Sequence, residues 1–325
     1  MSANLNQAAR MAGLMAAILC ALSACVQSPA AKTDAAPYQS YSEILAAAPA
    51  TAWRTPDPQN LLYMELASGR VVIELAPNVA PNHVANIHTL IRENYFDGLA
   101  IVRSQDNYVV QWGEPVDTKP PKLMGSAKTS LAPEFERVMS PDEFKAFAFD
   151  RLPDADGYAA QVGFASGFAA GRDPVRNAVW LAHCYGSVGV GRGASSTSGN
   201  GASLYAVTGH APRHLDRNIT VVGRVLQGMP LLSVLPRGTK ALGFYERAAE
   251  YTPIKSIRFA ADVPAAERTN LDVIRTDTPT FSRAVEALRN RGGDWFKVPA
   301  GHVELCNVPI SVRPTPSAAP ASTGK

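Results

Sequence analysis

Residues 61–75 read LLYMELASGRVVIEL, two apolar runs separated by a serine–glycine pair at positions 68 and 69. Runs of this length that are rich in branched residues and joined by so short a link are typical of a β-hairpin. Pro77 and Pro81 interrupt the extended pattern, and a helix is expected to begin near Asn82, where apolar residues start to recur every three or four positions. This part of the chain therefore predicts a hairpin followed at once by an amphipathic helix.

Other strand-like segments continue along the chain, with few helical patterns between them. They lie at residues 99–102, 108–112, 204–207, 219–226 and 253–259. This arrangement predicts a mainly β domain with one or two helices, most simply a closed barrel. Residues 114–180 are rich in proline, glycine and aspartate and show little periodicity. Because they are too many for a plain loop, we expect a functional segment or an elaboration packed on the domain.

The C-terminal part of the chain predicts one more helix and one more strand. The helix covers residues 279–291, with Thr278 as its N-cap and Pro279 in its first position, where a missing N–H leaves no hydrogen bond unmade. Residues 303–312 predict a strand. The proline-, alanine- and serine-rich residues 313–325 are expected to be disordered.

The composition excludes one broad class of partner. Of the 325 residues, 46% are hydrophobic, which is ordinary for a soluble globular domain. The formal net charge is only +3, and lysine and arginine form no block. Proteins that bind nucleic acids gain much of their affinity by neutralising phosphates. We therefore expect no nucleic-acid partner.

The N-terminus predicts an export signal. The uncharged apolar run at 11–24 is too short for a permanent membrane span and suits a signal peptide over residues 1–24. It ends in LSAC at 22–25, which resembles a bacterial lipobox, so that Cys25 would carry the lipid anchor. Residues 25–55 would form a flexible tether, and Val26, rather than an aspartate, favours the outer membrane on the periplasmic side. The alternative is an ordinary secretory signal with a chance cysteine.

Several segments together resemble cyclophilin-type peptidyl-prolyl cis/trans isomerases. GRVVIEL at 69–75, VAPNHVANI at 79–87 and YFDGL at 95–99 are similar to the family's opening, and HLDRNITVVGRVLQGM at 214–229 is similar to a later family segment. The resemblance implies a cyclophilin-like closed β-barrel capped by helices. This domain would cover residues 56–265, with an insert at about 115–180 and a C-terminal extension over 266–312.

The resemblance also implies an activity and a catalytic pair. The family pattern FHRxxPxFxxQGG is matched by IVRSQDNYVVQWG at 101–113, which keeps the arginine as Arg103 and the glutamine as Gln111. Arg103 would donate to the prolyl nitrogen when the X-Pro amide is twisted, and Gln111 would hold the arginine and the substrate carbonyl. The alternative without catalysis is that Arg103 is a structural ion-pair partner.

The expected proline pocket departs from the family at several positions. Tyr108, Val109 and Leu215 would receive the proline ring. His214 stands where the family has tryptophan, and Ala206 falls where a pocket phenylalanine is expected. Gly191 and Arg192, in the glycine-rich rim segment 186–201, would offer backbone contacts to the peptide, while the segment 202–205 lacks the family's second glutamine.

Two functional hypotheses follow from this pattern. The first is an active isomerase that acts on proline-containing exported proteins. The second is a catalytically weakened module that still binds proline-containing segments in the cell envelope. Neither needs a cofactor or a metal: the glycine-rich segment 189–193 lacks the P-loop lysine, and His183-Cys184 lacks nearby partner ligands. We expect a monomer.

Two cysteines remain once the signal peptide removes Cys20 and the lipid occupies Cys25. In an oxidising compartment, Cys184 and Cys306 would form a disulfide that pins the C-terminal extension to the barrel. The alternative is a pair of buried free thiols, because unpaired cysteine packs well as a small hydrophobe.

Overall fold

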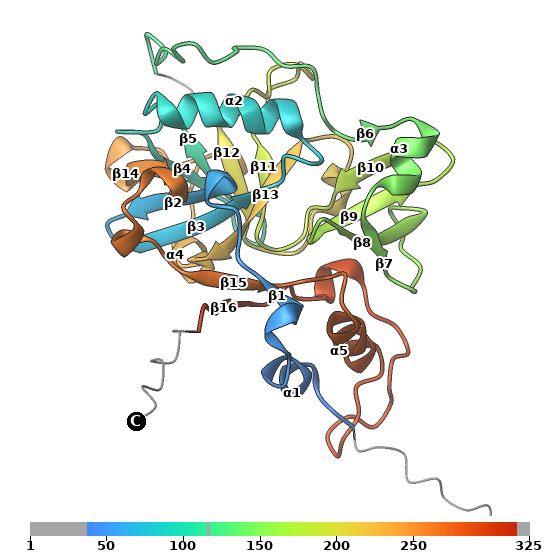
Figure 1. Cartoon of the computed structure of the whole chain (residues 1–325). Helices are drawn as coiled ribbons and strands as arrows, with labels where there is room; N and C mark the ends of the chain where they lie inside the picture. The colour runs from blue at the N-terminus through green and yellow to red at the C-terminus, as the bar shows by residue number, and fades with distance from the viewer. Residues whose placement is uncertain (1–37, 116–117, 317–325) are drawn as a thin grey trace, which may run out of the picture. The chain divides into compact units, whose positions relative to one another are not determined.

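The computed structural model describes residues 38–115 and 118–316 (Figure 1). The predicted signal peptide, Cys25 and residues 317–325 of the predicted disordered tail lie outside the described residues. The centre is a closed antiparallel barrel with the strand order β11-β12-β5-β4-β14-β2-β3-β13. Its strands are β2 (Leu61–Leu66), β3 (Gly69–Leu75), β4 (Ala100–Ser104), β5 (Val109–Gly113), β11 (Ser187–Val190), β12 (Leu204–Val207), β13 (Val221–Gln227) and β14 (Thr252–Phe259). The predicted mainly β barrel is therefore confirmed.

The predicted hairpin is present as β2 and β3, paired from Leu61 with Glu74 to Leu66 with Gly69. Its two faces pack on different cores. One face, which includes Met64, lies in the barrel interior. The other, which includes Tyr63, packs on Leu271 of the C-terminal extension. Burial on both faces explains why these strands read as nearly continuous apolar runs.

Helix α2 (Pro81–Arg92) covers the barrel. It begins at Pro81, one residue before the predicted start at Asn82. Its buried face adds Val84, Ile87 and Leu90 to the barrel core. Pro81 occupies the first position, where its missing N–H is harmless. A short helix α4 (Met229–Ser233) contributes the buried Leu232 to the same core.

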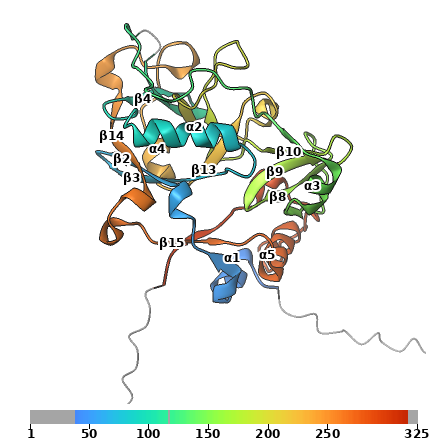
Figure 2. The same cartoon turned by 45° about the horizontal axis from the view of Figure 1, so that its top comes forward.

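The insert forms a second sheet beside the barrel (Figure 2). Its strand order is β6-β10-β9-β8-β7, with β6 (Arg137–Val138), β7 (Phe149–Arg151), β8 (Gln161–Ala165), β9 (Phe168–Asp173) and β10 (Ala178–Leu181), together with helix α3 (Pro141–Ala146). The pattern was invisible in the sequence because the strands are short and several of them are buried at consecutive positions, as β10 is throughout. Val179 and Phe168 pack on Val79 and Val221 of the barrel domain.

The predicted tether is wrong for the residues between 41 and 54. Helix α1 (Tyr41–Ala46) begins with a capping box between Ser40 and Glu43, and β1 (Trp53–Arg54) pairs with β15 (Leu271–Ile274). Ile44 and Leu45 are buried in a cluster with residues of the C-terminal extension. A few apolar side chains in an alanine- and proline-rich stretch are enough to fold it, once a second segment is there to cover them.

The C-terminal extension is partly as predicted. Helix α5 (Pro279–Arg289) begins at the expected cap, because the Thr278 side chain accepts a hydrogen bond from the Phe281 N–H. The predicted strand over 303–312 is wrong: the segment holds a 3-10 turn, η8 (Leu305–Asn307), and strand β16 (Val312–Pro314) begins at its end. β16 pairs with β15, so it also takes in two residues expected to be disordered.

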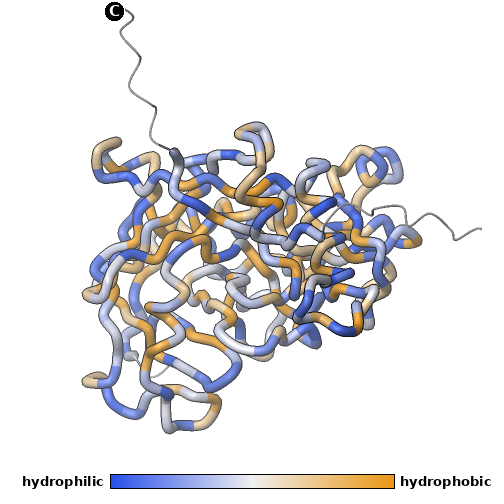
Figure 3. The backbone as a smooth tube through the Cα atoms, turned by 90° about the horizontal axis from the view of Figure 1, so that it is seen from below, coloured by the Kyte–Doolittle hydropathy of each residue, from blue (hydrophilic) through white to orange (hydrophobic). Residues whose placement is uncertain are grey.

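Figure 3 shows hydrophobic residues running through the barrel and its elaborations alike. They gather in separate clusters, one inside the barrel, one under the insert sheet and one between α1, α5 and the insert. The rim segment 186–201 is partly regular, because it includes the buried strand β11 near its start. In the described part of the chain, no helix combines the length and apolarity needed to cross a membrane.

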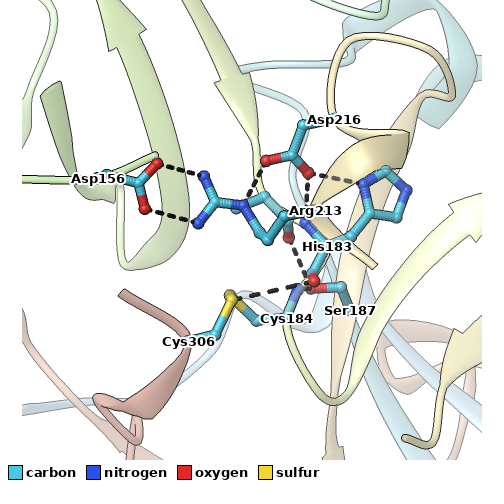
Figure 4. The surroundings of a disulfide bond; sticks show 8 residues. Asp156, His183, Cys184, Ser187, Arg213, Asp216 and Cys306 are labelled. Atoms are coloured by element: carbon cyan, nitrogen blue, oxygen red, sulfur yellow. Dashed lines mark hydrogen bonds and ion pairs between the residues drawn. A yellow bond between two sulfur atoms is a disulfide. The ribbon is translucent and has the colours of Figure 1, made fainter. Parts of the chain in front are cut away.

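A disulfide joins the extension to the barrel domain. Cys184 and Cys306 are bonded, with their Cα atoms 5.0 Å apart and a separation of 122 positions in sequence (Figure 4). Of the two alternatives that the sequence left open, the structure has the disulfide.

Candidate active site

The expected catalytic pair lies on two neighbouring barrel strands. Arg103 on β4 is paired in register with Gln111 on β5. The Arg103 Nη1 donates to the Gln111 Oε1 at 3.0 Å. The Gln111 Nε2 in turn donates to the Ser203 Oγ at 2.9 Å, so that Ser203 stands in the segment where a second glutamine was missing. The three side chains form one hydrogen-bonded row.

The remaining contacts of Arg103 hold its guanidinium in one orientation. The Nε donates to the Leu242 carbonyl at 2.6 Å, and the Nη2 donates to the Gln105 side chain. The guanidinium also lies over the Tyr108 and Phe244 rings, 5.7 and 5.3 Å from their centroids. A guanidinium has five N–H donors. Within residues 38–115 and 118–316, three are used, and two are left for a substrate.

The charge of Arg103 is secure although its side chain is partly buried. Burial lowers the pKa of the guanidinium from its ordinary value. That ordinary value is far above neutral pH, so the group stays protonated. The site therefore offers a fixed cation with free donors.

A small apolar cluster lies beside this cation, where the proline pocket is expected. It consists of Val109, Tyr205 and Val207, with Tyr108 and Ile219 packed against it. The His214 ring is parallel to the Tyr108 ring, with centroids 6.5 Å apart. Leu215 follows His214 in the turn η3 (Arg213–Leu215) and is half-buried.

The assignment of Ala206 to the pocket is wrong. Ala206 is fully buried and faces the barrel interior. Its neighbour Tyr205 faces the pocket and is paired in register with Gln111. Successive side chains of a strand point to opposite faces, so a slip of one residue exchanges the two. Tyr205, an aromatic residue, thus fills the place where the family phenylalanine was expected, and the pocket is not enlarged by an alanine.

Tyr205 reaches across β11 to a buried histidine. Its hydroxyl lies 2.8 Å from the His183 Nε2. The ring passes over Gly189, where an added Cβ would lie only 2.3 Å from the Tyr205 hydroxyl oxygen. Burial raises the pKa of Tyr205, so its hydroxyl stays neutral at physiological pH. From sequence alone, His183 is at most a candidate metal ligand, and nothing next to it predicts the contact with Tyr205. Among the described residues no cluster of three or more metal-ligating side chains is found.

Gly191 and Arg192 take different positions in the rim segment. The Gly191 N–H donates to the Ser203 carbonyl at 2.8 Å, beside the row of Arg103, Gln111 and Ser203. Arg192 fastens the rim segment, since its Nε donates to the Asn218 carbonyl at 3.0 Å and its guanidinium lies over the Phe135 ring. Peptide contacts by the backbone of these two residues stay a prediction.

Comparison with known proteins gives consistent results. The family model described as cyclophilin type peptidyl-prolyl cis-trans isomerase/CLD matches residues 61–258. A probable peptidyl-prolyl cis-trans isomerase of Brucella suis biovar 1 is 26% identical over 202 residues, which are 62% of this chain and 82% of that protein. Human peptidyl-prolyl cis-trans isomerase-like 1 is 29% identical over 99 residues, 30% of this chain and 54% of that one. The crystal structure of cyclophilin AquaCyp293 from Hirschia baltica matches with a TM-score of 0.62 at 25% identity, covering 85% of this chain and 98% of that chain.

Proposed function

The chain belongs to the cyclophilin-type peptidyl-prolyl cis-trans isomerases, since the family model matches more than half of it, and from this premise we propose how and where it acts. Arg103 stabilises the twisted X-Pro bond, the cluster around Tyr108 and Tyr205 receives the proline ring, and the substrates are exported proteins. The observation that carries the proposal is the fixed Arg103 guanidinium beside an apolar cluster that includes Tyr108 and Tyr205.

The chemistry needs a donor that acts only at the transition state. Rotation about the X-Pro bond faces a barrier of ~18–20 kcal/mol, because it breaks the amide resonance. In the twisted state the prolyl nitrogen regains its lone pair, and an N–H of Arg103 aimed at it stabilises that state more than either ground state. Gln111 keeps the guanidinium in place through the 3.0 Å hydrogen bond. No covalent intermediate is formed.

The test is a coupled isomerisation assay on a proline peptide, using the chain produced without residues 1–24 and with Cys25→Ser, so that it carries neither the signal peptide nor a lipid. Arg103→Ala should lose at least ten-fold in kcat/KM, and Arg103→Lys should not recover it, because an ammonium lacks the planar fork of donors. Arg247→Ala is the matched control, since Arg247 is well exposed and lies outside the pocket. Near-normal activity of Arg103→Ala would falsify the mechanism.

A second candidate is a proline-binding module with weakened catalysis. Ser203 in the glutamine position and His214 in the tryptophan position favour it. It predicts that the wild-type chain binds a proline peptide but does not speed the coupled assay.

For location, we propose a lipid-anchored periplasmic protein at the outer membrane. The LSAC motif at 22–25 supports the anchor, and the disulfide between Cys184 and Cys306 supports export, because disulfides persist in oxidising compartments. Without a catalyst, cis/trans isomerisation of an X-Pro bond takes tens of seconds, so an isomerase would speed the folding of exported chains.

The anchor has its own test. Labelled palmitate should enter the wild-type protein in cells and not Cys25→Ser, which should keep its signal peptide. More than one acyl chain is needed for stable anchoring, so wild-type protein should stay with the membrane fraction after a salt wash. Absence of label from the wild-type protein would contradict the anchor, while a retained label with release by salt would contradict stable attachment.

A further inference from the structure

A chain of buried polar groups runs from Tyr205 to the insert. Figure 4 shows its members His183, Asp216, Arg213 and Asp156. Its central member is His183, whose side chain is fully buried between Tyr205 and Asp216. We propose that His183 is a positioning residue that fixes Tyr205 as the wall of the proline pocket, and that the insert and the C-terminal extension serve to hold His183. This inference rests on the proposed function, because it assigns the pocket to proline.

The partners of the two ring nitrogens define the role of the imidazole. The Nδ1 lies 2.9 Å from the Asp216 Oδ1, a carboxylate oxygen that accepts hydrogen bonds. Nδ1 therefore carries the proton. In the neutral ring Nε2 then has a free lone pair, which accepts the Tyr205 hydroxyl proton across 2.8 Å. Asp216 thus fixes the orientation of the ring, and Nε2 on the opposite side is a fixed acceptor for the Tyr205 hydroxyl.

Asp216 is itself held from the insert. Its Oδ2 accepts from the Arg213 Nε at 2.5 Å, and the other two nitrogens of Arg213 form a two-bonded pair with Asp156, both at 3.0 Å. Asp156 belongs to the insert, between β7 and β8. All three of these side chains are at least nine-tenths buried. Paired, two-bonded contacts of this kind are strong and directional.

The C-terminal extension is bonded to Cys184, the residue that follows His183. The partner of Cys184 in this bond is Cys306 in η8. The His183 backbone N–H is also tied to the Asp216 carboxylate at 2.9 Å. His183 is therefore held directly by Asp216, which the insert supports through Arg213, and its neighbour Cys184 is tied to the C-terminal extension.

This arrangement has a consequence for substrate binding. A pocket wall that is already in place does not have to be ordered when the peptide arrives, so less free energy of binding is lost. Loosening Tyr205 should weaken proline binding, seen in KM and Kd, and should leave kcat nearly unchanged, because Arg103 acts at a separate place.

Two substitutions of His183 separate its two contacts. In His183→Gln an amide group replaces Nε2 and still reaches Tyr205, while in His183→Asn an amide replaces Nδ1 and reaches only Asp216. We expect KM and Kd for a proline peptide to rise about five-fold or more in His183→Asn, which loses the Tyr205 contact. They should rise about two- to three-fold in His183→Gln, which keeps that contact but loses the support of Asp216, with kcat within about two-fold in both variants. In a Tyr205→Phe background, His183→Asn should add no further change.

The outcome is readable even if the chain proves not to be an isomerase. Nuclear magnetic resonance of the whole mature chain with ¹³C-labelled tyrosine reports the Tyr205 ring without substrate: its signals should broaden or shift in His183→Asn and stay near the wild-type positions in His183→Gln. A wild-type chain without isomerase activity contradicts the proposed function, whereas equal Tyr205 signals in the two variants contradict the role of His183.

Folding failure of the histidine variants does not block the test. Tyr205→Phe removes a single oxygen and keeps the ring, so it should fold and still raise Kd about five-fold. An unchanged Kd in Tyr205→Phe, or effects of His183→Asn and Tyr205→Phe that simply add, would overturn the proposal.

Discussion

Among single residues, the glycine of the rim segment that approaches the hydrogen-bonded row of Arg103, Gln111 and Ser203 most closely is Gly191. A Cβ added at Gly191 would lie 2.8 Å from the Ser203 Oγ and 3.0 Å from the Gln111 Nε2. These two atoms are hydrogen-bonded to each other, and Gln111 in turn holds Arg103. The backbone conformation of Gly191 does not itself require glycine. A glycine is needed because a larger side chain would collide with Ser203 and Gln111.

Gly191→Ala should therefore displace Gln111 and lower kcat/KM by about three- to ten-fold, because small errors in the position of a catalytic group are costly. Gly193→Ala is the matched control two residues away, where an added Cβ would meet only the Ser198 Oγ at 3.6 Å, an ordinary contact. The measurement is the coupled assay with both variants. Equal kcat/KM values would show that the close approach of Gly191 is irrelevant to Arg103.

At the scale of elements, helix α2 takes its N-terminal cap from the insert. Its N-cap residue Ala80 has no side-chain acceptor. Glu134 takes that place: its Oε1 accepts from the Asn82 N–H at 3.0 Å and its Oε2 from the His83 N–H at 2.9 Å. A carboxylate at this end also complements the helix dipole. Because Glu134 is distant in sequence, no cap was visible next to the helix.

Glu134→Gln should lower the free energy of unfolding by about 1–2 kcal/mol, the usual range for a helix cap. Burial alone would raise the pKa of Glu134, but hydrogen bonds from His83 and from the backbone outweigh it and lower the pKa below the ordinary 4.5. A lowered pKa in the folded state means that the carboxylate stabilises the fold above about pH 4.5, and that this contribution is lost as the pH falls through the folded pKa.

Urea unfolding at several pH values tests this cap, with the exposed Glu246→Gln as control. The gap between wild type and Glu134→Gln should be full at pH 7 and shrink below pH 4.5. A gap that does not change with pH would mean that the carboxylate charge plays no part.

Across the molecule, a disulfide ties the C-terminal extension to the segment that leads from the insert back into the barrel. The disulfide closes a loop across 122 residues. In the chain-entropy model a loop of this size restrains the unfolded state by about 4–5 kcal/mol. The same bond lies next to His183, so it links global stability to the region behind the pocket.

The double variant Cys184→Ser, Cys306→Ser should lose about 3–5 kcal/mol of unfolding free energy relative to the oxidised wild type. Urea unfolding with and without dithiothreitol is the measurement. Reductant should bring the wild type down to the level of the double variant, which itself should not respond. A wild type that is indifferent to reductant, despite full reduction of the bond, would refute this contribution.

The sequence by itself determined the local elements and the family. The hairpin at 61–75, the start of α2 near Pro81 and the Thr278 cap of α5 were readable because they depend on residues two to four positions apart. Arg103 and Gln111 were readable from a continuous motif, and the structure brings them together across two adjacent strands.

Long-range contacts were needed to show which face of β12 lies on the side of Val109, and that the residue on this face is Tyr205 rather than Ala206. Only the tertiary structure decided that residues 41–54 fold onto the extension, that the insert forms a sheet and that Cys184 meets Cys306. Each of these depends on contacts between segments far apart in the chain. Burial against such a partner supplies the free energy that short, irregular or alanine-rich segments lack on their own, and the local sequence carries no record of the partner.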